Sequence, residues 1–157
     1  MTEAAGPITE ADYVDIPRDA RIKALYAYWD KVRGSRAMPA RADIDPAAIP
    51  RLLPFIVMYN VATDGNFRVQ LVGEEIVQFA GVNATGGLAG ATMPARAAAM
   101  VVKILETVKA ERVPKFRAGK AHWQPEKTYR DFEACFLPLS ADGETVNIVL
   151  SGVSFPG

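Results

Sequence analysis

Few side chains in this 157-residue chain could perform catalysis. His122 is the only histidine, so a serine or cysteine triad would depend on it entirely. Asp131 and Glu133 lie two positions apart in a β-rich run, and a strand would place them on the same face as paired carboxylates. We therefore keep one enzymatic hypothesis, a small α+β-cone enzyme that uses Asp131, Glu133 or His122 as its acid or base.

Other common chemical sites are missing from the sequence. Cys135 is the only cysteine and lies in an apolar run, which favours a buried, unreactive thiol over a nucleophile. One histidine and one cysteine cannot complete a zinc site, so we predict no metal. The glycines match neither a phosphate-binding loop nor a dinucleotide fingerprint. Glu74 and Glu75 precede a helical pattern, where negative charge suits the helix dipole.

Composition excludes several classes of partner. Acidic and basic residues balance at 18 each, so no net field favours nucleic acid or an anionic membrane. No apolar run approaches the ~20 residues needed to cross a bilayer. The first twenty residues lack the features of a secretory signal, and one cysteine cannot form an internal disulfide. We expect a cytoplasmic protein that neither binds nucleic acid nor inserts into a membrane.

The order of elements indicates the fold class. Asp142-Gly143 separates two β-rich runs, Phe132–Leu139 and Thr145–Phe155, which predicts an antiparallel hairpin. We expect Val113–Trp123 to pair with the first of these runs, and an early strand near Phe55–Val61 to lie next to the last strand in the sheet centre. Earlier parts of the chain give a second strand from Phe67, short helices within 73–92 and a longer helix after Pro94.

An amphipathic helix precedes these strands. We expect a disordered tail over 1–14, then one domain over 15–157 in which 15–34 is helical and 54–155 forms the core. Asp15 is the predicted cap, with Pro17 in the first turn and Gly34 as the stop. The apolar stripe is Ile22, Leu25, Trp29 and Val32. It requires a surface, either the outer sheet face through Cys135, Leu137, Val149 and Val153, or a second copy of the chain.

Three stretches resemble a known family. They are Tyr28-Trp29, then Met38-Pro39-Ala40-Arg41-Ala42-Asp43-Ile44-Asp45-Pro46, then Leu52-Leu53-Pro54. Together they are similar to the opening signature of proteobacterial single-domain PAS proteins, and Phe67–Gly73 continues the match. The resemblance implies an α+β PAS-like fold: a five-stranded antiparallel sheet with helices over one face, a pocket between them and an N-terminal flanking helix. Other α+β cones, including cystatin-like enzymes, usually place the long helix before the strands, whereas here two strands come first.

The resemblance also bears on cofactors. PAS domains that hold haem usually do so through a histidine on the long helix, and residues 94–111 contain none. Light-sensing flavin PAS domains carry an Asn-Cys-Arg motif on a helix, and this chain lacks that motif. We therefore predict no haem, flavin or other cofactor.

The most favoured function is a non-catalytic sensory module in bacterial signal transduction that binds a small apolar ligand, a signalling protein partner or both. Strand parity and the inner stripe of the long helix predict the pocket lining: Phe67, Val69, Phe79, Met100, Ile104, Phe116, Phe132 and Phe136, with His122 as a possible hydrogen-bonding group. A homodimer through the N-terminal helix is a further possibility. Arg36 and Arg41 are expected to anchor their segment to carbonyls or carboxylates, or else to contact a partner. An unliganded structural adaptor is the third hypothesis.

Overall fold

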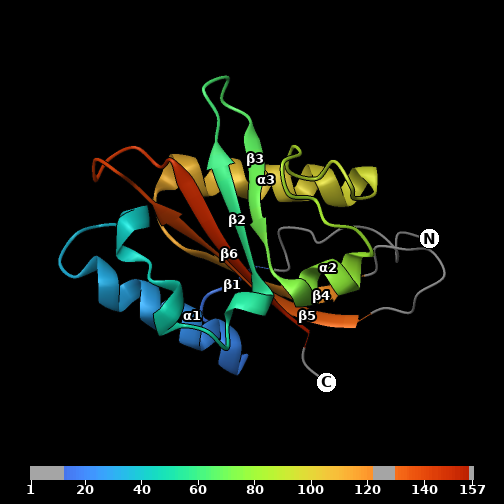
Figure 1. Cartoon of the computed structure of the whole chain (residues 1–157), viewed down its shortest axis with the longest axis horizontal. Helices are drawn as coiled ribbons and strands as arrows, with labels where there is room; N and C mark the ends of the chain where they lie inside the picture. The colour runs from blue at the N-terminus through green and yellow to red at the C-terminus, as the bar shows by residue number, and fades with distance from the viewer. Residues whose placement is uncertain (1–12, 122–129, 156–157) are drawn as a thin grey trace.

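The computed structural model describes residues 13–121 and 130–155, and its centre is one antiparallel sheet (Figure 1). Six strands lie in the order β1-β4-β5-β6-β2-β3. Their bounds are β1 Tyr13–Val14, β2 Ile56–Val61, β3 Phe67–Val72, β4 Lys115–Ala121, β5 Arg130–Leu139 and β6 Ile148–Ser154. The α-helices are α1 Ala20–Arg33, α2 Glu74–Ala80 and α3 Ala95–Glu111. Three single 3-10 turns, Arg41–Asp43, Pro46–Ala48 and Leu53–Phe55, connect α1 to β2. The predicted α+β fold is confirmed.

The last two strands form the predicted hairpin. β5 pairs antiparallel with β6, and Leu139 lies opposite Ile148. The turn is built on Asp142, whose Oδ1 accepts the N–H groups of Glu144 and Thr145 at 2.9 and 2.8 Å. These backbone hydrogen bonds lower the pKa of the Asp142 carboxyl to about 2. Because Thr145 serves the turn, β6 begins at Ile148 instead of at Thr145.

The remaining strand pairings also follow the expectation. β2 lies between β6 and β3, so the early strand is inside the sheet and next to the last strand. β4 pairs with β5 along its whole length. One strand is new: Tyr13 and Val14, expected in a disordered tail, pair with Arg117 and Phe116 at the edge of the sheet. The rest of that predicted tail, residues 1–12, lies outside the described residues.

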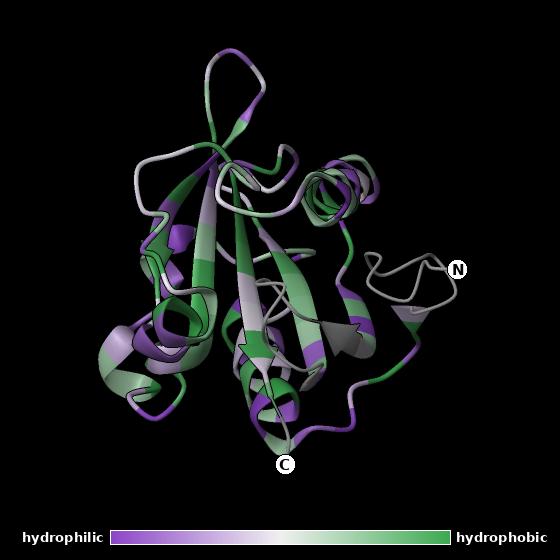
Figure 2. Cartoon of the chain, turned by 90° about the vertical axis from the view of Figure 1, so that its right-hand side faces the viewer, coloured by the Kyte–Doolittle hydropathy of each residue, from purple (hydrophilic) through white to green (hydrophobic). Residues whose placement is uncertain are grey.

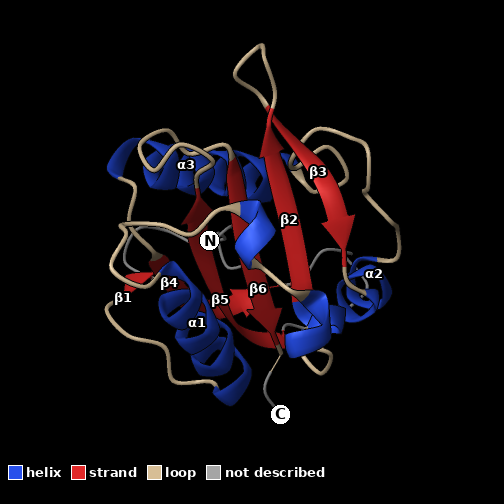
Figure 3. Ribbon diagram, turned by 60° about the vertical axis from the view of Figure 1, so that its left-hand side comes forward, coloured by secondary structure: helices blue, strands red, loops and turns tan. Residues whose placement is uncertain are grey.

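Helices cover both faces of the sheet. α3 contacts β5 and β6 from one side, and α1 contacts the same two strands from the other (Figure 3). We call the face beneath α1 the outer face and the face beneath α3 the inner face. Apolar residues therefore run along the central strands, while the helices turn polar residues toward solvent (Figure 2). Among the described residues, no helix has both the length and the apolar character that crossing a bilayer requires.

The start of α1 differs from the prediction. Asp19, and not Asp15, is the N-cap: its Oδ1 accepts the N–H groups of Arg21 and Ile22 at 2.8 and 3.2 Å. Asp15 lies four residues too early to reach those groups. The predicted stop at Gly34 is confirmed, since its φ is 63° and its N–H bonds the carbonyl of Lys31.

The apolar stripe of α1 packs on the outer face of the sheet. Ile22, Leu25 and Trp29 are buried, Val32 is partly buried, and the Trp29 Nε1–H donates to the Pro138 carbonyl at 2.9 Å. Cys135 and Leu137 lie on this face as predicted. Val149 and Val153 do not, because the hairpin register pairs Cys135 with Gly152 and Leu137 with Leu150. Gly152 and Leu150 therefore occupy the outer positions, and the two valines face inward.

Candidate functional site

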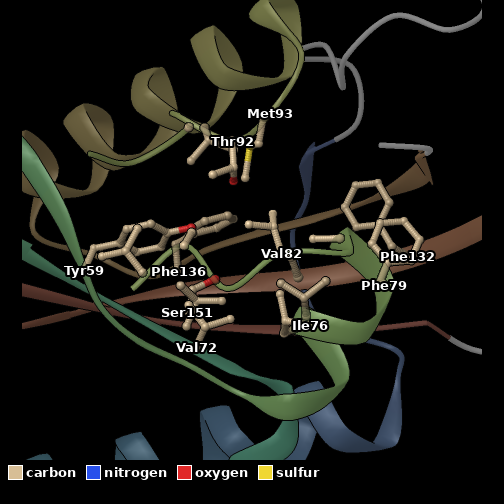
Figure 4. A pocket seen from close by; sticks show the side chains of 18 of the residues that line it. Tyr59, Val72, Ile76, Phe79, Val82, Thr92, Met93, Phe132, Phe136 and Ser151 are labelled. Atoms are coloured by element: carbon tan, nitrogen blue, oxygen red, sulfur yellow. The ribbon is translucent and has the colours of Figure 1, made fainter. Parts of the chain in front are cut away.

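An apolar cavity of about 120 Å³ lies between the inner face and the helices α2 and α3 (Figure 4). Each central strand contributes alternate residues, because successive side chains of a strand point to opposite faces. β5 provides Phe132, Ala134 and Phe136, and β6 provides Ser151 and Val153. The cavity floor is thus set by the register of the hairpin.

The walls of the cavity come from residues 76–101. Phe79 of α2 stacks on Phe155, with their ring centroids 4.3 Å apart, and Val101 is contributed by α3. The loop before α3 meets that helix at Gly90, whose φ is 84°. A Cβ at Gly90 would lie 2.8 Å from the Ala98 Cβ, so only glycine lets the loop close this wall.

Four polar side chains interrupt the apolar lining: Tyr59, Thr92, Arg117 and Ser151. The Ser151 Oγ is buried, and among the described residues it has no hydrogen-bond partner. Burial raises the pKa of the Tyr59 hydroxyl above its ordinary value, so the group stays protonated. Figure 4 shows the side chains of Tyr59, Thr92 and Ser151 around the same space.

Arg117 is the charged residue of this lining. It is only 2% exposed, and its guanidinium carbon lies 5.4 Å from the centroid of the Tyr13 ring. Arg117 pairs with Ala134, an inner-face residue of β5, which fixes the direction of its side chain. The edge strand β1 therefore packs beside the one charged group of the described cavity lining.

Four of the predicted lining residues border the cavity: Val69, Phe79, Phe132 and Phe136. Others lie elsewhere. Phe67 is buried on β3 near the end of α3, where Lys109 lies 5.9 Å from its ring centroid. Ile104 is fully buried and Met100 is partly buried, but α3 turns Val101 to the cavity instead of either of them.

Phe116 lies on the opposite face from the one predicted. It pairs with Cys135 and packs edge-on against Tyr26 of α1, with the ring centroids 5.0 Å apart. Parity along β4 therefore gives the inner position to Arg117. His122 lies outside the described residues.

The two candidate carboxylates do not converge on the cavity. Glu133 is buried on the outer face, where its Oε2 accepts the N–H groups of Arg18 and Asp19 at 2.5 and 2.9 Å. Asp131 lies two residues earlier in β5, so it is on the same face of the sheet, and its side chain is exposed.

Cys135 is fully buried beneath α1, and burial raises the pKa of its thiol to about 12. The described residues include no metal-binding cluster of three or more His, Cys, Asp or Glu side chains.

The candidate partner residues make contacts within the chain. Arg36 donates to the carbonyls of Val32 and Arg33 at 2.7 and 3.0 Å, and its Nη1 lies 2.9 Å from the Asp43 carboxylate. Hydrogen bonds from the Ala40 N–H and from Arg36 lower the pKa of Asp43. The Arg41 Nη1 donates to the Ile44 carbonyl at 3.2 Å. Both arginines thus hold the segment that follows α1.

Sequence reasoning missed Tyr59, Arg117, Ser151 and most of the wall from residue 80 to residue 93. The sequence shows that residues alternate between the two faces of each strand. Which of the two alternating sets faces the cavity depends on how the strand is paired with its neighbours. The Gly-rich wall has no periodicity to read. β4 also contains Lys115 and Lys120, so its sequence carries no signal that marks Arg117 as the inward charged position.

Comparisons with known proteins agree with the fold. A family model described as a PAS domain matches residues 18–153. No curated protein matches the chain. Among solved structures, the PAS domain from Bordetella pertussis BvgS is similar with a TM-score of 0.54 at 16% identity, over 85% of this chain and 87% of that chain. That likeness shows the fold alone.

Two LOV structures are more distant. The light-state structure of the blue-light photoreceptor Aureochrome1 LOV gives a TM-score of 0.47 at 12% identity, over 70% of this chain and 87% of that chain. A light-oxygen-voltage domain studied with a flavin analogue gives 0.43 at 13% identity, over 71% of this chain and 83% of that chain.

Proposed function

The chain belongs to the PAS domain family, and from this premise we propose that it binds a small apolar ligand in the inner-face cavity and signals through a protein partner. In this proposed function the chain catalyses no reaction. The candidate acids and bases among the described residues lie on the outer face, with Glu133 occupied in holding the start of α1.

The cavity is the observation that carries this function. The cavity leaves about 120 Å³ in which the lining side chains have no packing partner, so these contacts are missing in the unliganded chain. A ligand of matching shape regains those contacts. The buried Ser151 hydroxyl, which has no hydrogen-bond partner among the described residues, adds a polar group that a ligand can satisfy.

Size limits the class of ligand. An engineered cavity of ~150 Å³ in another protein, lined by Leu, Ile and Phe, stays dry and binds benzene. The present cavity is of that order, so a molecule with one ring, or a branched chain of similar bulk, fits without rearrangement.

The sheet connects the ligand cavity to the surface that a partner would contact. β5 and β6 line the cavity on one face and support α1 on the other. A ligand that displaces these strands changes the surface beside α1, where a signalling protein or a second copy of the chain would read it. The apolar stripe of α1 already packs within its own chain, so such a partner would contact the exposed face of the helix.

Two measurements test the proposal. Native mass spectrometry of protein purified from its own host should show a retained small molecule as a mass difference. Melting experiments with benzene or toluene should raise the Tm of the full chain. The variant Ala134→Leu fills the cavity and should abolish this rise, whereas Ala24→Leu, on the exposed face of α1, should leave it intact.

If the purified protein carries no molecule and neither probe raises the Tm, the ligand-binding proposal fails. The chain would then act as a structural adaptor. An equal rise in Ala134→Leu would place the binding site elsewhere.

A further inference from the structure

A buried hydroxyl on the cavity floor identifies a narrower class of ligand. Ser151 is only 1% exposed, and among the described residues its Oγ has no hydrogen-bond partner. Its side chain borders the cavity, so a molecule in the cavity can reach the Oγ. A buried hydroxyl that makes no hydrogen bond has lost its hydration without compensation, and this loss is unfavourable. A ligand that forms a hydrogen bond with Ser151 recovers it.

A second hydroxyl borders the same part of the cavity. Ser151 of β6 lies opposite Val57 of β2, and Tyr59 is two residues further along β2 on the same face. Such diagonal neighbours lie roughly 7–8 Å apart, within reach of an aromatic side chain. Figure 4 shows Tyr59 and Ser151 around one space, and burial keeps the Tyr59 hydroxyl protonated by raising its pKa. The cavity therefore presents two hydroxyls, each able to donate one hydrogen bond and to accept others.

We propose that the ligand carries one hydroxyl group on a compact apolar body, as a phenol does, and that this hydroxyl binds Ser151 and Tyr59. This inference rests on the proposed ligand-binding function and specifies its chemistry. A ligand hydroxyl suits the pair because it can accept a hydrogen bond from one of the two groups and donate a hydrogen bond to the other. A few polar groups in an otherwise apolar pocket are the usual means by which a protein orients a ligand.

The apolar body of the ligand would lie over Ala134. Ser151 pairs with Phe136 across the hairpin, and Ala134 lies two residues before Phe136, so it is a diagonal neighbour of Ser151 on the inner face. Ala134 is the smallest side chain that β5 contributes to the lining, between Phe132 and Phe136. A ring above Ala134 would contact both phenylalanines, while its hydroxyl reaches across β6 toward β2.

Phenol and toluene test this inference because they have nearly the same shape and only phenol has a hydroxyl. Calorimetric titration of the full chain measures the Kd of each. Ser151→Ala should weaken phenol binding about tenfold, because the phenol hydroxyl loses a hydrogen-bond partner, and should leave the Kd of toluene within about twofold. Tyr59→Phe should weaken phenol binding in the same direction. Ser154→Ala is the matched control, since it makes the same substitution on the outer face of β6 and should change neither Kd.

The outcomes separate the two proposals. If toluene binds and Ser151→Ala weakens phenol and toluene binding equally, the apolar-ligand function stands and the hydroxyl inference is overturned. If phenol binding is unchanged in Ser151→Ala and in Tyr59→Phe, the inference is also overturned. If neither probe binds the wild-type chain, both proposals fail. Each variant removes a single hydroxyl, so either one decides the question where the other fails to fold.

Discussion

The two faces of the sheet differ in how completely they are filled. On the outer face, α1 packs closely enough that a Cβ at Gly152 would lie 2.7 Å from Leu25 Cδ2 and 3.3 Å from Cys135 Sγ. On the inner face, the same strands border a cavity of about 120 Å³. Polar groups follow the same division. Trp29, Glu133 and Ser154 are hydrogen bonded on the outer face, whereas Ser151 on the inner face has no such partner among the described residues.

The two faces of the same sheet therefore have different roles: the outer face stabilises the fold, and the inner face can respond to a ligand. The outer face contributes dense contacts and satisfied polar groups, which hold the native state. The inner face forgoes contacts that a bound molecule can supply. Substitutions on the two faces should therefore change the free energy of unfolding by different amounts, and in one case in opposite directions.

Trp29→Ala should have the largest effect. It removes a large buried side chain and the hydrogen bond to Pro138, so we expect a loss of about 3–5 kcal/mol in the free energy of unfolding. Urea denaturation measures this. The cavity-side control, Val101→Ala, should cost roughly 1 kcal/mol or less, because Val101 is half-buried and already borders empty space. Equal losses would contradict the division between the faces.

Gly152→Ala tests how tightly α1 sits on the sheet. The added methyl overlaps Leu25, and overpacking of this kind costs about 1–3 kcal/mol. Gly87→Ala is the matched control, since the nearest atom to its Cβ is the Ala84 carbonyl oxygen at 3.5 Å. A Gly152 variant as stable as the wild type would mean that α1 adjusts freely, and the outer face would then not be the rigid one.

Glu133→Gln removes the charge that accepts the N–H groups of Arg18 and Asp19 while keeping one oxygen acceptor. Hydrogen bonds to charged groups contribute about 1.5–3 kcal/mol, so we expect a loss of about 1–2 kcal/mol by thermal or chemical unfolding. Glu106→Gln, on the exposed side of α3, should remain within about 0.5 kcal/mol of the wild type. If the two variants are alike, the buried carboxylate does not anchor α1.

The two serines of β6 give the smallest effect and the sharpest contrast. Ser154→Ala should cost about 1 kcal/mol, because its Oγ accepts a hydrogen bond from the Arg21 guanidinium at 3.1 Å. Ser151→Ala should be neutral or stabilising by up to about 1 kcal/mol, since it removes a buried hydroxyl without a partner among the described residues. Chemical denaturation of both variants measures the sign. A clear loss in Ser151→Ala would mean that its hydroxyl is satisfied after all.

The order of strands and helices could be predicted from sequence because it depends on local signals. Asp142-Gly143 marks the hairpin, the stripe of α1 marks the helix, and Pro94 marks the start of α3. The facing of each strand depends on register, which is set by pairing between distant segments. Phe116 and Val153 were consequently assigned to the wrong faces.

The candidate site was less predictable than the fold. Aromatic residues such as Phe132 and Phe136 were found because large apolar side chains belong inside. Arg117 and Ser151 were missed because polar residues are expected outside, and only a structure shows them at an inner position. The wall around Gly90 follows no period, so its contribution depends entirely on contact with α3.

Cys135 can report on opening of the outer face in the unmodified protein. It is the only thiol in the chain, it is fully buried beneath α1, and burial raises its pKa to about 12, so the folded protein keeps it protonated at neutral pH. A thiol reagent can react only when α1 lifts from the sheet or the chain unfolds. The labelling rate therefore reports how often the outer face opens. A change in this rate on adding a cavity ligand measures how strongly the inner and outer faces of the sheet are coupled.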